Sequence, residues 1–256
     1  MDKVKQSIKK LCDSNCQLYG FRCFNGTYAR IKNDMLQSFS IIKTRGQDLY
    51  NVYFGIVPLC NKILSLDMHI YSLDQFYDDT NIYSYGWSPD MTGIEACTQR
   101  IIMAIEKYLL PLFLKCNNCK EALNELIAIE TIFESNRNIV LQREQRSDCA
   151  EHQWFSSMFD PNKYCLAMKA RDYNYMQQHL KLKLSFYNKR IYDIKNGVSN
   201  QPDIVYQNLI RDREETRIHL LKLEEHDAFY FDQLIASQEL KTTVFLKERY
   251  PKLFEE

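Results

Sequence analysis

Two cysteines separated by two residues form the motif with the clearest potential for chemistry. They stand in Cys116-Asn117-Asn118-Cys119, and Cys119 falls at the start of a predicted helix, where the helix dipole lowers a thiol pKa. Such a pair could exchange disulfides or supply half of a metal site. However, no second Cys or His pair follows at a zinc-site spacing, and a predicted helix rather than a strand precedes the motif. The simpler interpretation is structural cysteines at a helix junction, and the question of their function stays open.

Three aspartates, Asp74, Asp78 and Asp79, lie close together in a segment with turn composition. Neighbouring carboxylates can hold a divalent cation or serve as acid and base. No EF-hand glycine or phosphate-binding loop stands beside them, so turn residues and surface charge are the simpler interpretation. A hydrolase-like enzyme with a site between sheet and helices, using Asp78, Asp79 or His69, is retained as a competing hypothesis.

The five histidines are scattered, and no pair has a metal-ligand spacing. Glu224, Glu225 and His226 are adjacent, but sequence neighbours do not share a helix face. The sequence contains no HExxH, GxSxG, Walker, Rossmann or kinase signature. We therefore predict no metal, no cofactor and no catalytic residues, and we lean against an enzyme.

An aromatic segment over 71–89 is the better candidate for a binding site. Tyr and Trp are enriched at recognition surfaces because they offer a large contact area with few torsions. The alternative is that these rings cover one face of the sheet. The predicted binding residues are Tyr71, Phe76, Tyr77, Asp78, Asp79, Tyr83, Tyr85 and Trp87.

A second aromatic group, farther along the chain, alternates with basic residues. Such interleaving can bind nucleic acid, which makes a nucleic-acid-binding accessory protein another alternative. The chain nevertheless carries 33 basic and 33 acidic side chains, whereas a dedicated nucleic-acid binder shows a cationic excess. We favour an amphipathic core helix containing Tyr173, Tyr175, Lys181, Lys183, Phe186, Tyr187, Lys189, Arg190 and Tyr192.

These residues must be positioned by an α+β fold, a small antiparallel sheet of three to four strands packed with helices and followed by an all-helical C-terminal region. Six of the seven glycines precede residue 94, which places the turn-rich sheet early in the chain. A helix is predicted over 2–18. Strands are predicted over 27–32, 35–43, 49–57 and 63–71, the last two from alternating apolar residues.

Helices are predicted over 94–115 and from Cys119 to about Phe133, with Asn118 as an N-cap and Pro111 as a kink or end. Asp160-Pro161 has the composition of a further helix start. Longer helices follow over 173–195, 204–225 and 227–250. We predict an α+β domain over 1–135, a polar linker over 136–150 and a helical domain over 151–256.

Several short stretches of the first half resemble a bacterial family catalogued as domain of unknown function 4304. The resemblance covers about residues 1–130 and implies a bacterial origin and a fold of helix, sheet and closing helix. It implies no activity and no catalytic residues. The stretches are Tyr19-Gly20-Phe21, Tyr28-Ala29-Arg30, Gln37-Ser38-Phe39, Val52-Tyr53-Phe54-Gly55-Ile56 and Leu110-Pro111.

A single segment over 161–195 resembles a tetratricopeptide-type helical hairpin, without a clear 34-residue period. It favours a helical interaction module. The charged start of the chain lacks the apolar run of a secretion signal, and no apolar stretch has the length of a membrane span. We therefore expect a cytoplasmic protein with free thiols, and the resemblance given above implies that it is bacterial.

Taken together, these patterns favour a non-catalytic module that binds a protein partner. Immunity or defence is one version of this hypothesis. Binding of nucleic acid is disfavoured, no membrane association is predicted, and self-association through the C-terminal helices is a further option.

Overall fold

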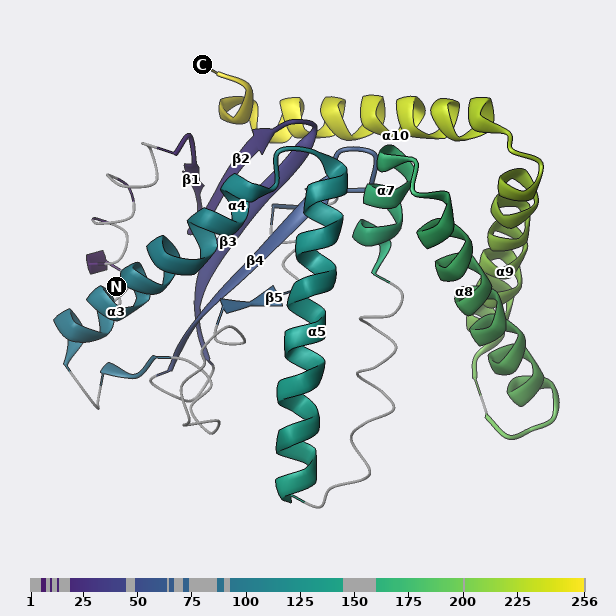
Figure 1. Ribbon diagram of the computed structural model, residues 1–256, viewed down its shortest axis with the longest axis horizontal. Helices are drawn as coiled ribbons and strands as arrows, with labels where there is room; N and C mark the ends of the chain where they lie inside the picture. The colour runs from purple at the N-terminus through teal and green to yellow at the C-terminus, as the bar shows by residue number, and fades with distance from the viewer. Residues whose placement is uncertain are drawn as a thin grey trace.

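A five-stranded antiparallel sheet and a set of long helices make up the protein in this computed structural model (Figure 1). The structure describes residues 6–7, 10, 13, 19–44, 49–63, 65–66, 71–73, 87–89, 93–144, 160–199 and 201–255, with only the backbone over 133–144. The strands follow one another in chain order across the sheet. They are β1 (Arg22–Phe24), β2 (Thr27–Lys32), β3 (Met35–Lys43), β4 (Tyr50–Pro58) and β5 (Tyr71–Ser72).

Two tight turns set the register of the first three strands. Asn25 and Gly26 join β1 to β2, and Asn33 and Asp34 join β2 to β3. All four residues have positive φ, the conformation that a two-residue hairpin turn of type I′ requires. Phe24 therefore pairs with Thr27, and the long β3–β4 ladder continues the pattern across the sheet.

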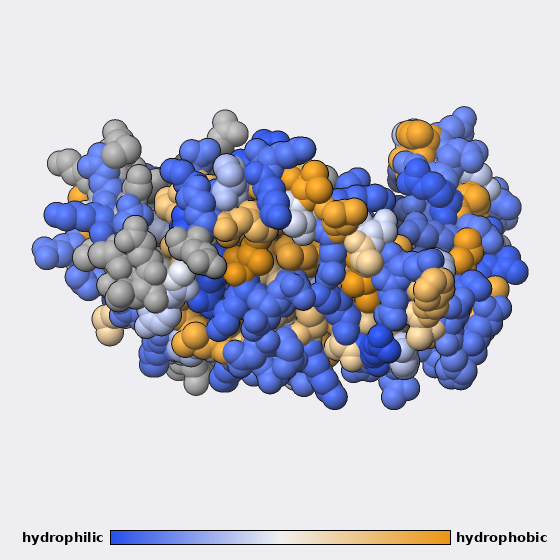
Figure 2. Space-filling view, turned by 90° about the horizontal axis from the view of Figure 1, so that it is seen from above, coloured by the Kyte–Doolittle hydropathy of each residue, from blue (hydrophilic) through white to orange (hydrophobic). Residues whose placement is uncertain are grey.

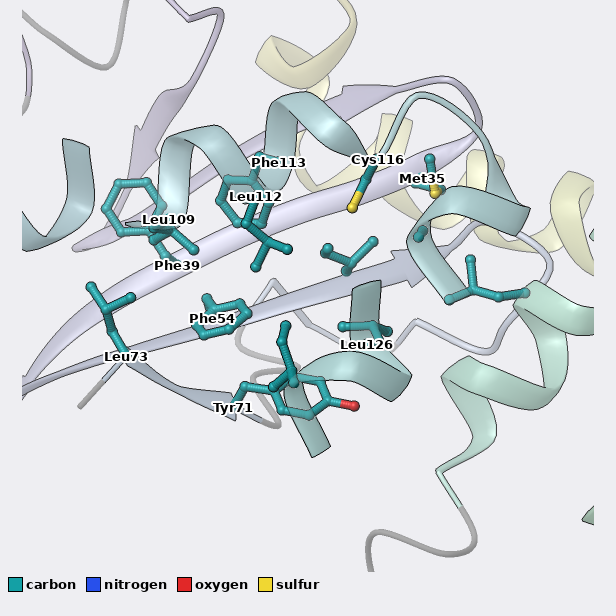
Figure 3. Packing of buried hydrophobic residues seen from close by; sticks show 14 of the residues in the cluster. Met35, Phe39, Phe54, Tyr71, Leu73, Leu109, Leu112, Phe113, Cys116 and Leu126 are labelled. Atoms are coloured by element: carbon teal, nitrogen blue, oxygen red, sulfur yellow. The ribbon is translucent and has the colours of Figure 1, made fainter. Parts of the chain in front are cut away.

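One face of the sheet is covered by helices α3 (Ile94–Ala104) and α4 (Leu110–Lys115), with the π-helical turn η2 (Ile105–Leu109) between them. Alternate residues of the strands point into this layer, because side chains along a strand alternate between faces. The ring centroid of Phe113 of α4 lies 5.4 Å from that of Phe21 and 6.3 Å from that of Phe54. Figure 3 shows Phe113 and Phe54 among the side chains between α4 and the sheet. This layer is the main hydrophobic core.

Pro111 neither ends nor visibly breaks the helix over 94–115. Proline lacks the backbone N–H that would bond four residues back. The preceding residues form the π-helical turn, in which Leu110 N donates to Ile105 O, five residues back. The wider π-helical turn accommodates Pro111, and the helix continues to Lys115.

Helix α5 (Cys119–Glu144) follows the predicted capping residue. Asn118 Oδ1 accepts a hydrogen bond from Glu121 N at 2.9 Å, and the Glu121 carboxylate accepts from Asn117 N at 3.0 Å. The predicted N-cap is confirmed. The helix runs beyond Phe133, so the backbone over 136–144 is helical where a linker is predicted.

The second half of the chain forms helices of which the second packs along both the first and the third. Asp160 caps the first of them by accepting a hydrogen bond from Asn162 N at 2.9 Å, as predicted. Arg171 adopts the left-handed conformation, and Asp172 then caps the next helix. The helices are α7 (Pro161–Ala170), α8 (Tyr173–Lys195), α9 (Asp203–Glu224) and α10 (Ala228–Arg249), followed by the short helix η3 (Pro251–Phe254).

The C-terminal helix α10 returns to the opposite face of the sheet, so the two halves of the chain are joined. Leu246 is fully buried in a second cluster with Leu36 and Val57. Thr242 Oγ1 donates to Asn61 O at 2.8 Å, beside the end of β4. At the chain terminus, Arg22 of β1 forms an ion pair with Glu255 at 3.0 Å.

The predicted α+β class with a helical C-terminal region is confirmed, although the sheet has five strands rather than three to four. The predicted strand over 63–71 is wrong for residues 63, 65 and 66, which lie outside any strand. Ile63 and Leu66 are nevertheless buried in the second cluster, where they pack from a loop. The predicted helix over 2–18 falls mostly outside the described residues.

The main core crosses the predicted domain boundary. Leu166 and Met176 of the helical region belong to the same buried cluster as Phe54 and Leu126. The division into domains 1–135 and 151–256 stays a prediction, and residues 145–159 lie outside the described part of the chain. Among the described residues, no helix has the length and apolar character needed to cross a bilayer.

Candidate functional site

Of the eight predicted binding residues, the structure describes Tyr71 and Trp87, and both are buried. Trp87 N donates to Tyr50 O at 2.8 Å, and Tyr50 N donates to Trp87 O at 2.9 Å, which fixes the tryptophan against the edge of β4. These two rings are part of the main core. The other six, Phe76, Tyr77, Asp78, Asp79, Tyr83 and Tyr85, lie outside the described residues, as do His69 and Asp74, so the binding role of this segment stays a prediction.

Tyr71 belongs to a buried polar cluster that joins β5 to α5 and α7. Its hydroxyl donates to Asp160 Oδ2 at 3.2 Å and lies 3.3 Å from Glu130 Oε1. Lys163 forms an ion pair with the other oxygen of Glu130. Burial raises the pKa of Asp160 to about 6, and burial together with both carboxylates raises the pKa of Tyr71. The cluster holds two carboxylates beside one ammonium group, so it ties three elements together through charge-assisted bonds.

The two cysteines of the CxxC motif are buried rather than activated. Burial raises the pKa of Cys116 to about 12 and that of Cys119 to about 11. Desolvation of the thiolate therefore outweighs the helix N-terminus that was expected to lower the pKa of Cys119. No group of three or more metal-ligating side chains is found among the residues that the structure describes.

The predicted helix with basic and aromatic residues is α8, which has one buried side and one exposed side. Tyr187 is buried, as a core helix requires, whereas Lys181, Lys189 and Tyr192 are exposed. The buried side of α8 also carries His179, which lines a cavity together with residues from other helices.

This cavity of about 210 Å³ lies where α7, α8, α9 and α10 meet the loop after β4. Tyr164 of α7 stands between two histidines, with ring centroids 5.3 Å from His179 and 6.0 Å from His219. The Tyr164 hydroxyl is within hydrogen-bond distance of His219 Nδ1, at 3.2 Å. The loop contributes Cys60, whose thiol donates to Cys165 O at 3.5 Å.

The electrostatics of the cavity keep its histidines neutral. Burial, assisted by Lys183, lowers the pKa of His179 to about 4. Burial also lowers the pKa of His219, although Glu215 opposes the shift. Burial raises the pKa of Tyr164, and a hydrogen bond to Cys165 together with burial raises that of Cys60. Near pH 7 the imidazole, phenol and thiol groups of the cavity wall are therefore neutral.

The outer face of α10 is the other distinctive surface. Phe229, Leu240 and Val244 are 70%, 67% and 45% exposed. They lie on one side of the helix with Gln233 and Ala236, opposite the buried Phe231, Thr242 and Leu246. Figure 2 views the molecule from the side of α10 and shows apolar residues among the hydrophilic ones on this face. We refer to Phe229, Gln233, Ala236, Leu240 and Val244 as the α10 stripe.

Comparison with known proteins identified no relative: no family model, no curated protein and no solved structure matches the chain. The resemblance to the domain of unknown function 4304 family and the tetratricopeptide-like character of 161–195 therefore stay predictions.

Sequence reasoning missed both the cavity and the α10 stripe. The cavity residues come from segments as far apart as Cys60 and Gln238, so no local spacing connects them. The stripe was detectable, because apolar residues occur on two sides of the helix from Ala228 to Arg249. Among the described residues, one of these two sides is buried against the rest of the protein and the other is exposed.

Proposed function

We propose that the protein is a non-catalytic binding module of the bacterial cytoplasm, with immunity or defence as one setting, and that it recognises a protein partner through the α10 stripe. The observation that carries the proposal is the exposure of three large apolar side chains on one side of a helix whose other side is buried. Exposed apolar side chains gathered on one surface are a mark of protein interaction sites.

The spacing of the stripe supports an extended helical partner. Phe229, Leu240 and Val244 follow each other at intervals that keep them on one side of an α-helix. With a rise of about 1.5 Å per residue, the stripe is about 22 Å long, or roughly four turns. Gln233 and Ala236 have small or flexible side chains between the large ones, which leaves room for side chains of a partner helix.

The charges near the C-terminal end of α10 indicate which charges the partner should carry. Between Leu240 and Arg249 the helix carries three cations, Lys241, Lys247 and Arg249, against one carboxylate, Glu248. Among the described residues, none of these cations forms an ion pair. At the other end, Asp232 is already paired with Arg171. The expected partner is an amphipathic helix whose apolar side faces the stripe and whose acidic residues lie near Lys241.

Site-specific cross-linking tests the proposal. A photo-reactive amino acid at position 240 in the native host should yield one discrete adduct with another protein. The same group at position 182, on the exposed side of α8, should not yield it. The captured protein is then purified and mixed with the wild-type chain to establish a defined stoichiometry.

Two results would overturn the proposal. Cross-links only between copies of this chain would make the stripe a self-association surface. Equal adducts from positions 240 and 182 would show that capture reflects general surface contact.

A further inference from the structure

The cavity beside Tyr164 contains opposite charges that do not neutralise one another. Lys183 of α8 and Glu215 of α9 both line it. No ion pair joins them in the part of the chain that the structure describes. Lys183 instead lies near the ring of Tyr187, with its ammonium group 5.8 Å from the ring centroid. The cavity therefore presents Lys183 and Glu215 as opposite charges to whatever enters it, and Lys62 of the loop after β4 is a second cation in its wall.

Apart from Lys62, the remainder of the wall is neutral and partly apolar. His179 and His219 flank Tyr164 without carrying charge near pH 7. Leu180 and Leu234 add aliphatic surface. A ligand would thus meet hydrogen-bonding rings and hydrophobic surface between the two charged groups, which is the usual composition of a small-molecule site.

The volume of the cavity limits the size of the ligand. Drug-sized ligands occupy pockets of roughly 300–1,000 Å³. At about 210 Å³, this cavity admits only a smaller molecule. Glu215 is exposed, so the cavity is accessible from the surface at α9.

We propose that this cavity binds a small zwitterion, a free amino acid with an apolar side chain. Lys183 forms an ion pair with the carboxylate of the amino acid, and Glu215 forms an ion pair with its ammonium group. The side chain lies against Leu180 and Leu234. A ligand with a single charge would satisfy one of the two groups and leave the other without a partner. The site is independent of the α10 stripe and does not rest on the proposed partner.

The test is isothermal titration calorimetry of the full chain, preceded by a thermal-shift screen of the twenty amino acids. The discriminating probes are L-leucine, isocaproate, which lacks the ammonium group, and isoamylamine, which lacks the carboxylate. The variants Lys183→Met and Glu215→Gln each remove one charge. Their matched controls, Lys181→Met and Glu214→Gln, remove the same charges from neighbouring residues that do not line the cavity.

The expected result is that at least one apolar amino acid binds the wild-type chain more tightly than either singly charged analogue. Lys183→Met and Glu215→Gln should each weaken binding by roughly tenfold or more, because each removes a charged hydrogen-bond partner. Both controls should bind as the wild type does. The proposal is overturned if no amino acid binds at millimolar concentration, if a singly charged analogue binds as tightly, or if the variants match their controls.

Discussion

The Tyr71 hydroxyl lies 3.2 Å from Oδ2 of Asp160, which links the last strand of the sheet to the first turn of α7. Both residues are almost fully buried. The contact connects the half of the chain that was expected to form a sheet with the half that was expected to be helical. Removing the Tyr71 hydroxyl therefore removes a contact between the two halves of the chain.

Replacing Tyr71 with Phe should destabilise the fold by about 1–3 kcal/mol, because the buried Asp160 carboxylate loses a hydrogen-bond donor. Urea denaturation monitored by circular dichroism measures this loss. Tyr192→Phe is the matched control, since Tyr192 is 64% exposed and its change should stay within about 0.5 kcal/mol. Equal stability of Tyr71→Phe and the wild type would show that the hydroxyl contributes nothing.

His179 should make stability fall as the solution becomes acidic. Its folded-state pKa is about 4, below its ordinary 6.5, so the unfolded chain binds more protons between these values. Its contribution is therefore present above pH 6.5 and is lost as pH falls towards 4. From pH 7 to pH 5 the wild type should lose about 2 kcal/mol relative to His179→Gln.

The comparison with His179→Gln is needed because Asp160 acts in the opposite direction. Its pKa is raised to about 6, so its protonation stabilises the folded state as pH falls below 6. Both proteins contain Asp160, and its contribution cancels in the difference. Parallel stability curves for the two proteins would contradict a neutral, buried His179.

The thiols of Cys116 and Cys119 should react slowly with alkylating reagents. Because burial raises the pKa of Cys116 to about 12 and that of Cys119 to about 11, little thiolate exists at pH 8. Mass spectrometry after brief iodoacetamide treatment should find Cys23, which is exposed, alkylated before either of them. Rapid modification of Cys119 ahead of Cys23 would instead support an active thiol.

Leu246→Ala tests whether the two halves unfold together. Leu246 is fully buried between α10 and the sheet, and its truncation should cost about 2–5 kcal/mol. If the shared core makes unfolding cooperative, the wild type and Leu246→Ala should each show a single unfolding transition. In each protein, the midpoint measured by circular dichroism should equal the midpoint measured by tryptophan fluorescence. Separate transitions, with only one of them shifted, would support two independent domains.

Local signals in the sequence predicted local structure well. The caps at Asn118 and Asp160 depend on side chains that bond within a few residues, so composition alone locates them. The Asn25-Gly26 turn carried an equally strong signal, but the strand before it has only three residues and escaped notice. The predicted strand over 63–71 failed at residues 63, 65 and 66, because apolar side chains such as Ile63 and Leu66 can be buried from a loop as well as from a strand.

Long-range features could not be read from the sequence. The expectation that aromatic rings cover the sheet holds for Tyr71 and Trp87, yet their partners Asp160 and Tyr50 are distant in the chain. The cavity requires Tyr164, His179 and His219 to meet across three helices, which depends on helix packing. Spacing within one segment contains no such information.

The central claim is that the α10 stripe binds a partner helix, and titration calorimetry with the cross-linked protein in purified form tests it most directly. Leu240→Asp should weaken binding by about 10–100-fold, since it removes a buried apolar side chain from the interface and places a charge there. Leu182→Asp makes the same change at another exposed leucine and should bind as the wild type does. If Leu240→Asp also binds as tightly as the wild type, the stripe is not the binding surface.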